Sequence, residues 1–404
     1  MKFIHFADAH LDSPFRGLSF LPSNSFNQIY QAANQSFERI VDLALKEKVD
    51  LVLIAGDTFD SNQPSPHSQL FFAKQIKRLT DAEIQVVMIF GNHDHMKVDD
   101  LLITPSPYFK LLGPDEKVES VSYETKSGFK YDVVGFSYLN NHIAHDVIPD
   151  FPEKSNNYTF GIMHAQQKTD HQDVYAPFTL SEVTDLNYDY FALGHIHHRR
   201  VLSDRPWVVY PGNIQGRHIN ETALKGCYLG EIDEKTGQTT ISFKPTSPII
   251  WKKVTLKLAD PLSKKTLHEK ILATLKSDNF TTYFSLTIEN AQYLTEEERE
   301  LVQDSSYWQG ISLELSQNSQ LVDVRFKTQS LPSLSVENQA TSKQAATEIF
   351  TNSALKEIAA GWVKKSALTQ ELAEDPEFLA EIKEMSQVKL SSKLRGVSDE
   401  IEEN

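Results

Sequence analysis

Short apolar runs alternate with helical patterns over about the first 215 residues of the chain. Seven of these runs are rich in β-branched or aromatic residues and end in glycine or a polar group, which predicts buried strands. They are residues 2–7, 49–56, 84–91, 131–138, 158–165, 188–195 and 207–213. An apolar stripe from 37 to 45 predicts an amphipathic helix, and Ser65 followed by Pro66 predicts the start of another. Strands that alternate with helices indicate a layered α/β fold.

The pattern changes from Trp251 onward and predicts a second, smaller α+β domain. Its elements are a strand at 251–258, a helix at 265–276, a strand at 281–289, a helix from Thr295 and apolar stretches at 311–316 and 321–326. Thr295 opens a Thr-Glu-Glu-Glu capping box. The chain is therefore divided into a domain at 1–250, a small domain at 251–327, a polar linker at 328–343 and a helical partner-binding tail at 344–404.

Composition and charge narrow the class of protein. The length of 404 residues exceeds the roughly 250–300 residues of a single core, which agrees with more than one domain. The formal net charge of −15 means that any affinity for nucleic acid has to be local. The single cysteine, Cys227, cannot form an internal disulfide, and no apolar run reaches the ~20 residues of a membrane span. We expect a soluble cytoplasmic protein with no membrane segment.

Metal-binding residue types follow five of the predicted strands. They are Asp8 and His10, Asp57, Asn92 and His93, His164, and His195 with His197. Each of them alone is explained more simply as a turn or a helix cap. Ligands of α/β sheets bind beyond the carboxyl ends of the strands, so the five strand ends are expected to converge. Together they favour a metal site.

A site for two divalent ions accounts for these residue types. Two ions ~3.5–4 Å apart need a carboxylate between them, and Asp57 suits that role. Mixed imidazole, carboxylate and amide ligands favour Mn²⁺, Fe²⁺ or Zn²⁺, of which we expect Mn²⁺. Alternation along an extended segment places His195 and His197 on one side and His198 on the other.

The motifs resemble the signature of a known family. "DAH", "GDTFD", "GNHD", a single histidine and "GHIH" follow each other in the order found in calcineurin-like metallophosphoesterases. With "PS" after "GDTFD", a "YPGN" segment, a small second domain and a helical C-terminus, the chain is similar to SbcD-type DNA nuclease subunits, and most to their YhaO-type branch. The resemblance implies a layered β-sandwich flanked by helices.

The resemblance also implies a role for each motif residue. Asp8, His10, Asp57 and His197 would hold the first ion, and Asp57, Asn92, His164 and His195 the second. His93 would not be a ligand but would act on the phosphate or the leaving oxygen, with Asp94 orienting it. Archaeal and eukaryotic relatives have a histidine at the position of Asp60, so a second catalytic histidine is not expected from that loop.

Three functions remain open at this point. The first is a metal-dependent DNA exonuclease or endonuclease subunit that works with an SbcC-like ATPase, for which the resemblance also implies a homodimer. The second is a phosphodiesterase or phosphatase for small nucleotides or phosphoproteins, and the third is a protein-binding scaffold without catalysis. The basic residues His198, Arg199, Arg200 and Arg217 either line a phosphate-binding rim for DNA or belong to a solvated loop.

Overall fold

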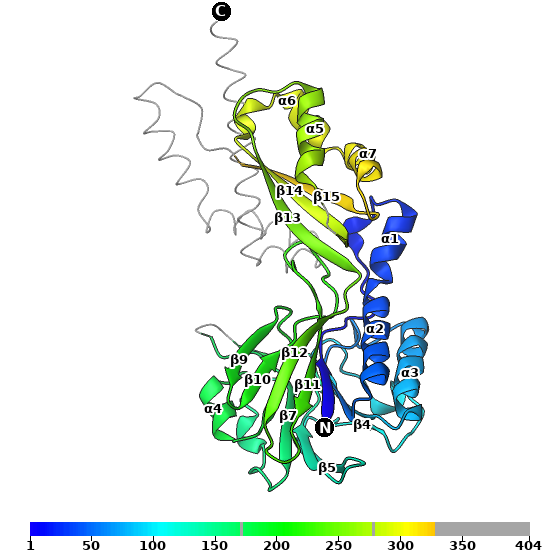
Figure 1. The fold of residues 1–404 in the computed structure, drawn as a ribbon, viewed down its shortest axis with the longest axis vertical. Helices are drawn as coiled ribbons and strands as arrows, with labels where there is room; N and C mark the ends of the chain where they lie inside the picture. Colours follow the sequence, from blue (N-terminus) through cyan, green and yellow to red (C-terminus); the bar gives the residue numbers. More distant parts are fainter. Residues whose placement is uncertain (170–172, 277–278, 328–404) are drawn as a thin grey trace, which may run out of the picture. The chain divides into compact units, whose positions relative to one another are not determined.

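The computed structural model describes residues 1–327 except 170–172 and 277–278 (Figure 1). The linker and the partner-binding tail predicted at 328–404 lie outside the described residues. The chain divides into two compact units. The first consists of Met1–Trp251 and Phe280–Thr282, and the described part of the second lies within 252–279 and 283–327. None of the described helices has the length and apolar character needed to span a bilayer.

The first unit contains two six-stranded sheets. The order of the first sheet is β12 (Thr239–Pro245), β11 (Gly226–Ile232), β1 (Lys2–Phe6), β2 (Leu51–Ala55), β3 (Gln85–Ile89) and β4 (Phe109–Leu111). The order of the second is β5 (Glu119–Glu124), β6 (Lys130–Gly135), β7 (Tyr158–His164), β8 (Tyr190–Gly194), β10 (Trp207–Tyr210) and β9 (Arg200–Asp204). Strands β1 to β4 are parallel, as are β6, β7, β8 and β10. The carboxyl ends of the central strands therefore meet at one edge of each sheet.

All seven predicted strands are present, which confirms the α/β class. Of the remaining strands of these two sheets, β4, β5, β9 and β12 are not predicted because they lie at or near an edge and are short or half exposed, whereas β11 is buried inside the first sheet and was missed. β5 and β12, for example, alternate between partly buried and exposed residues at the outer edges of the two sheets. Such strands lack the continuous apolar run that identifies a buried parallel strand.

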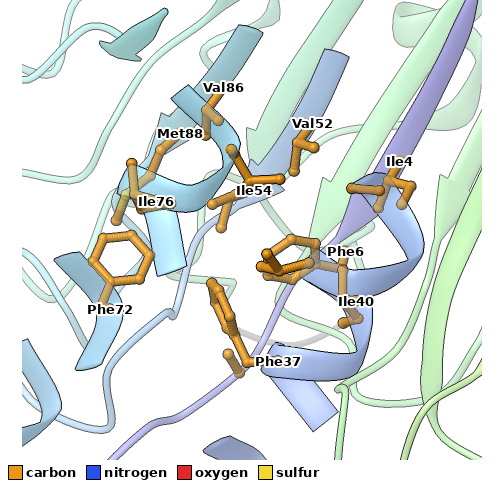
Figure 2. Close-up of a cluster of buried hydrophobic side chains, with 14 of the residues drawn as sticks. Ile4, Phe6, Phe37, Ile40, Val52, Ile54, Phe72, Ile76, Val86 and Met88 are labelled. Carbon is orange, nitrogen blue, oxygen red and sulfur yellow. The ribbon is translucent and has the colours of Figure 1, made fainter. Parts of the chain in front are cut away.

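Three apolar clusters hold the layers of the first unit together. The inner cluster joins the two sheets, with Phe3 and Leu53 from one and Phe160 and Tyr190 from the other. A second cluster packs α2 (Ala32–Glu47) and α3 (Pro66–Asp81) onto the outer face of the first sheet (Figure 2). A third packs α4 (Leu180–Asp185) and neighbouring loops onto the second sheet. The result is a helix, sheet, sheet, helix sandwich.

Local signals explain where the helices of this unit begin. The predicted stripe at 37–45 lies within α2, where Phe37 and Ile40 are buried. Ser65 caps α3, and its hydroxyl accepts the backbone N–H of Ser68 at 3.3 Å. The short α1 (Ser23–Tyr30) precedes α2, and three 3-10 turns lie at Arg16–Leu18, Val98–Asp100 and Ile148–Asp150.

The second unit is a small α+β fold. Its sheet consists of β13 (Ile249–Lys257), β14 (Thr281–Glu289) and β15 (Gln320–Lys327), with β14 between the other two, although residues 249–251 and 281–282 at the starts of two strands are assigned to the first unit. The helical elements are α5 (Lys264–Thr274), a 3-10 turn at Ala291–Tyr293, α6 (Glu296–Gln303) and α7 (Ser305–Glu314). The apolar stretch at 311–316 belongs mostly to the end of α7, whereas the stretch at 321–326 lies in β15. The helices pack on the sheet through one apolar cluster.

Candidate metal centre

The strand ends of the first unit bring together all seven residues predicted as metal ligands. Asp8 and His10 follow β1, Asp57 follows β2 and Asn92 follows β3, so the first sheet supplies four of them. The second sheet supplies His164 at the end of β7 and His195 and His197 after β8. The register aligns the strand ends, because Phe6 pairs with Ile54 and Ile54 pairs with Met88. Convergence therefore follows from sheet topology.

The first cluster consists of Asp8, His10, Asp57 and His197. The Nε2 atoms of His10 and His197 lie 3.0 Å apart, and His10 Nε2 lies 3.7 Å from Asp57 Oδ2. Ligand atoms of Asp8, His10 and His197 all lie within 4.8 Å of one another. These atoms converge on one point and fit a cation.

The second cluster consists of Asp57, Asn92, His164 and His195. His164 Nε2 lies 3.0 Å from Asn92 Oδ1 and 3.3 Å from Asp57 Oδ2. His195 Nδ1 lies 3.2 Å from the same Asn92 oxygen. Asp57 Oδ2 thus lies near a histidine of each cluster, at the position that a carboxylate shared by two cations would occupy.

Four of the seven residues have a left-handed backbone. The φ angles are 52° at Asp8, 43° at His10, 50° at Asp57 and 96° at His195. Residues with a side chain rarely adopt this region, which costs of order 1–3 kcal/mol each and concentrates at functional sites. Backbone bonds hold the turns in place, with Asp8 N–H donated to Gly56 O and His10 N–H donated to Asp57 O.

Burial and neighbouring charges set the protonation of these groups. Burial raises the pKa of Asp57, but the His164 charge and hydrogen bond outweigh it and hold that pKa well below its usual range. Burial lowers the pKa of His164, and the charge and hydrogen bond of Asp57 outweigh this and raise it to about 9. Burial lowers the pKa of both His10 and His195 to about 3. The ionised Asp57 and the neutral His10 and His195 are already in the form that binds cations, whereas His164 has to lose a proton first.

His93 differs from the seven in exposure. Its side chain is exposed although Asn92 and Asp94 beside it are buried. The His93 backbone N–H is donated to Asp57 Oδ1 at 2.9 Å, and His93 Nδ1 lies 3.2 Å from Asp60 O. The ring is therefore next to the clusters and open to a substrate.

Asp94, which the resemblance predicts to orient the His93 ring, is fully buried. Its two carboxylate oxygens accept backbone N–H groups, from Gly91 and from Thr58, at 2.7 Å each. Burial and the charge of Asp57 raise the pKa of Asp94 to about 7. Both oxygens are thus engaged by backbone groups, and the orienting of His93 by Asp94 stays a prediction. Asp94 ties together the turns after β2 and β3.

Two buried residues of the site were not predicted. Glu221 Oε1 pairs with His197 Nδ1 at 2.5 Å, and Glu221 Oε2 accepts Asn213 Nδ2–H at 2.7 Å. Asn213 is the last residue of the "YPGN" segment. Glu221 lies in an irregular loop after β10, without a strand or a motif next to it, so no local pattern identifies it.

The basic residues near the site have separate environments. Arg217 pairs with Asp60, whose Oδ1 also lies 3.2 Å from His10 Nδ1. The Arg199 guanidinium lies 3.8 Å above the Phe243 ring, and Arg200 begins the edge strand β9. His198 is exposed. Arg217 is thus the member of this group that is joined to the clusters.

Comparison with known proteins matches the N-terminal half of the chain to the calcineurin-like phosphoesterase family, over residues 1–199. The uncharacterized metallophosphoesterase YhaO of Bacillus subtilis is 35% identical over 280 residues, which are 67% of this chain and 66% of that protein. The DNA double-strand break repair protein Mre11 of Sulfurisphaera tokodaii is 26% identical over 269 residues, 62% of each chain. The matches span no more than two thirds of either relative.

A crystal structure of a dimetal phosphatase from Danio rerio is 12% identical, with a TM-score of 0.35, over 57% of this chain and 92% of that one. The family match over residues 1–199 contains every member of the two clusters and His93. Sequence motifs, sheet topology and the family match therefore agree, and with this N-terminal half the chain belongs to the calcineurin-like metallophosphoesterases.

Proposed function

We propose that the chain is a metal-dependent phosphodiesterase that cleaves DNA. The observation that carries the proposal is the pair of clusters that share Asp57, because this arrangement fits two divalent ions and the family uses a dimetal site. Bound ions would activate water as the nucleophile and neutralise charge on the phosphate. The mixed nitrogen and oxygen donors favour Mn²⁺ over Mg²⁺, with Fe²⁺ and Zn²⁺ as the competing ions.

The chain's own residues divide the remaining work. Asp57 is shared by the two clusters, and its Oδ1 accepts the His93 backbone N–H and so fixes the position of that residue. His93 Nδ1 faces the Asp60 carbonyl, which directs Nε2 away from that loop as the proton donor to the leaving oxygen. Arg217, held by Asp60 beside His10, offers a guanidinium to a phosphate next to the scissile one.

DNA is favoured as the substrate by two observations. Several curated relatives are named DNA double-strand break repair protein Mre11. The chain also carries a second folded unit, which a phosphatase for small molecules does not need. The competing candidates are a phosphodiesterase or phosphatase for small nucleotides or phosphoproteins, and a scaffold without catalysis.

One assay separates these candidates. The full-length protein with Mn²⁺ is given a generic phosphodiester, linear duplex DNA and a phosphomonoester side by side. We expect cleavage of DNA and of the phosphodiester. Cleavage of the monoester alone would favour a phosphatase, and a metal-loaded protein that cleaves none of the three would favour a scaffold.

We also propose two protein partners. The first is an SbcC-like ATPase with coiled coils, bound through residues 344–404. Truncation after Lys343 is expected to leave cleavage of a small phosphodiester nearly intact and to abolish co-purification with that ATPase. Retained binding by the truncated chain would contradict this division.

The second partner is another copy of this chain. Leu70 on α3 and the nearby Val98 and Leu102 are exposed by 62%, 49% and 49%. The Gln69 side chain joins the two segments, since it donates to Asp100 O and accepts Leu102 N–H. An exposed apolar surface of this kind favours an interface. Sedimentation of Leu70→Asp beside the wild type tests it, with a monomeric variant and a dimeric wild type expected.

A further inference from the structure

A buried carboxylate whose two oxygens are both hydrogen bonded contacts one of the candidate metal ligands. Glu221 is 4% exposed, and both of its oxygens are engaged. Oε1 contacts His197 Nδ1 at 2.5 Å and His218 Nε2 at 3.3 Å. Oε2 accepts Asn213 Nδ2–H at 2.7 Å and Arg217 N–H at 2.6 Å. A carboxylate held by so many donors has one fixed position.

The contact determines which nitrogen of His197 faces the first cluster. Glu221 accepts a hydrogen bond from Nδ1–H, and Nε2 lies 3.0 Å from His10 Nε2. An imidazole that donates through one nitrogen presents a lone pair at the other, and a carboxylate acceptor raises the basicity of that lone pair.

The backbone of His197 is fixed as well. Lys225 is 5% exposed, and its ammonium donates to His197 O at 2.7 Å. Gly212, at a φ of 74°, passes so close that a Cβ there would lie 2.7 Å from the same oxygen. Asn213 N–H also reaches this carbonyl, at 3.3 Å. His197 is therefore held at its ring and at its main chain by one loop.

The two clusters differ in this respect. Both histidines of the first cluster have a carboxylate at the outer nitrogen, Glu221 for His197 and Asp60 for His10. In the second cluster, the outer nitrogen of His164 is hydrogen bonded to a backbone carbonyl, Ala55 O at 3.0 Å. Since Arg217 pairs with Asp60, Glu221 is the carboxylate at an outer ring nitrogen of this cluster that no arginine side chain neutralises among the described residues.

We propose that Glu221 is a positioning residue that keeps the Nδ1 proton on His197 and makes the first cluster the tighter of two metal sites. The inference rests on the proposed function, since it assumes that both clusters bind ions. Glu221 itself touches neither an ion nor a substrate. Removing its charge weakens one site and leaves the ligands in place.

The test is metal binding by the full chain with Glu221→Gln. Mn²⁺ is titrated into metal-free protein by calorimetry, and bound ions are counted by elemental analysis and by electron paramagnetic resonance. We expect the wild type to hold two ions with a spin-coupled signal. The variant is expected to bind one of the two about 10- to 100-fold more weakly and to show a mononuclear signal when Mn²⁺ is limiting. Glu231→Gln, at an exposed position of β11, is the matched control and is expected to bind as the wild type does.

A second measurement needs no change at Glu221. In wild-type protein with ¹⁵N-labelled histidine and Zn²⁺ as a diamagnetic probe, the Nδ1 of His197 is expected to carry the proton, with the signal assigned by its loss in His197→Gln. A proton on Nε2 would overturn the inference even if Glu221→Gln failed to fold. Unchanged affinity for both ions in Glu221→Gln would overturn it while the proposed function stands. A wild type that binds no Mn²⁺ would overturn both.

Discussion

At the scale of residues, the site is built on Asp57. Its Oδ2 lies 3.7 Å from His10 Nε2 and 3.3 Å from His164 Nε2, and its Oδ1 accepts the His93 N–H. One carboxylate therefore joins both clusters to the exposed histidine. Variants at this site are expected to fall into two groups. Variants of the first group bind metal more weakly, and variants of the second keep the metal but hydrolyse phosphodiesters more slowly.

His93→Ala belongs to the second group. Because the side chain is exposed and its Nδ1 lies against the Asp60 carbonyl, metal content is expected to stay at the wild-type level. Hydrolysis is expected to fall by about 10²–10⁴-fold, the usual contribution of a proton donor. Steady-state rates on a generic phosphodiester, with elemental analysis of the same samples, measure both. An empty His93→Ala site would assign His93 to metal binding instead.

Gly91→Ala belongs to the first group. A Cβ at this position would lie 2.7 Å from the Asp57 backbone nitrogen and closer still to its carboxylate. We expect weaker Mn²⁺ binding and a loss of about 1–3 kcal/mol in the free energy of unfolding, because the turn has no room. Gly310→Ala is the control, since a Cβ there meets nothing within 4 Å. Equal metal binding by both variants would show that the turn can adjust.

At the scale of elements, strand ends explain what the sequence could predict about this site. The seven ligand candidates follow apolar runs that are recognisable as buried strands, and parallel strands bring their carboxyl ends together. Glu221 and Lys225 have no such signal, because their positions depend on a loop and on contacts 24 and 28 residues away from His197. The Asp94 contacts with Gly91 and Thr58 were missed for the same reason, since one of them joins two different turns.

The caps of helices are a second kind of local signal. The capping box predicted at Thr295 is present, with the Thr295 hydroxyl accepting Glu298 N–H and the Glu298 carboxylate accepting Thr295 N–H. Thr295→Ala is expected to lower the free energy of unfolding by about 0.5–2 kcal/mol. Denaturant unfolding measures it, with Glu300→Gln on the exposed side of α6 as the control. A loss no greater than in the control would mean that the cap contributes little to this unit.

At the scale of the whole molecule, the clusters connect residues that are far apart in the chain. Asp8 and His197 belong to one cluster and come from different sheets, so they meet only when the first unit is folded. Ions bound there would therefore stabilise the folded form of this unit and not its unfolded form. Binding to the native state only stabilises it by about 2.7 kcal/mol at a ligand concentration 100 times the Kd.

Thermal unfolding is therefore expected to depend on metal. The midpoint of the metal-free chain is expected to rise when Mn²⁺ is added and to return when a chelator removes it, together with phosphodiester cleavage. Asp57→Asn should remove the shift because it weakens both clusters. A midpoint and an activity that are the same in Mn²⁺ and in chelator would contradict the two-metal function.

The buried, left-handed position of Asp8 affects any attempt to raise the thermal stability of the protein. Burial raises the pKa of Asp8, so its charge is costly unless a cation is bound, and the φ of 52° is one that asparagine tolerates as well as aspartate does. Asp8→Asn would keep an oxygen for the His195 N–H. Calorimetry of metal-free protein is expected to show the variant unfolding at a higher temperature than the wild type, while its Mn²⁺ capacity falls; a lower temperature would contradict this reasoning. A screen for thermal stability in the presence of a chelator would thus select variants that have lost the metal site, because stability of the metal-free fold and metal binding favour different residues at position 8.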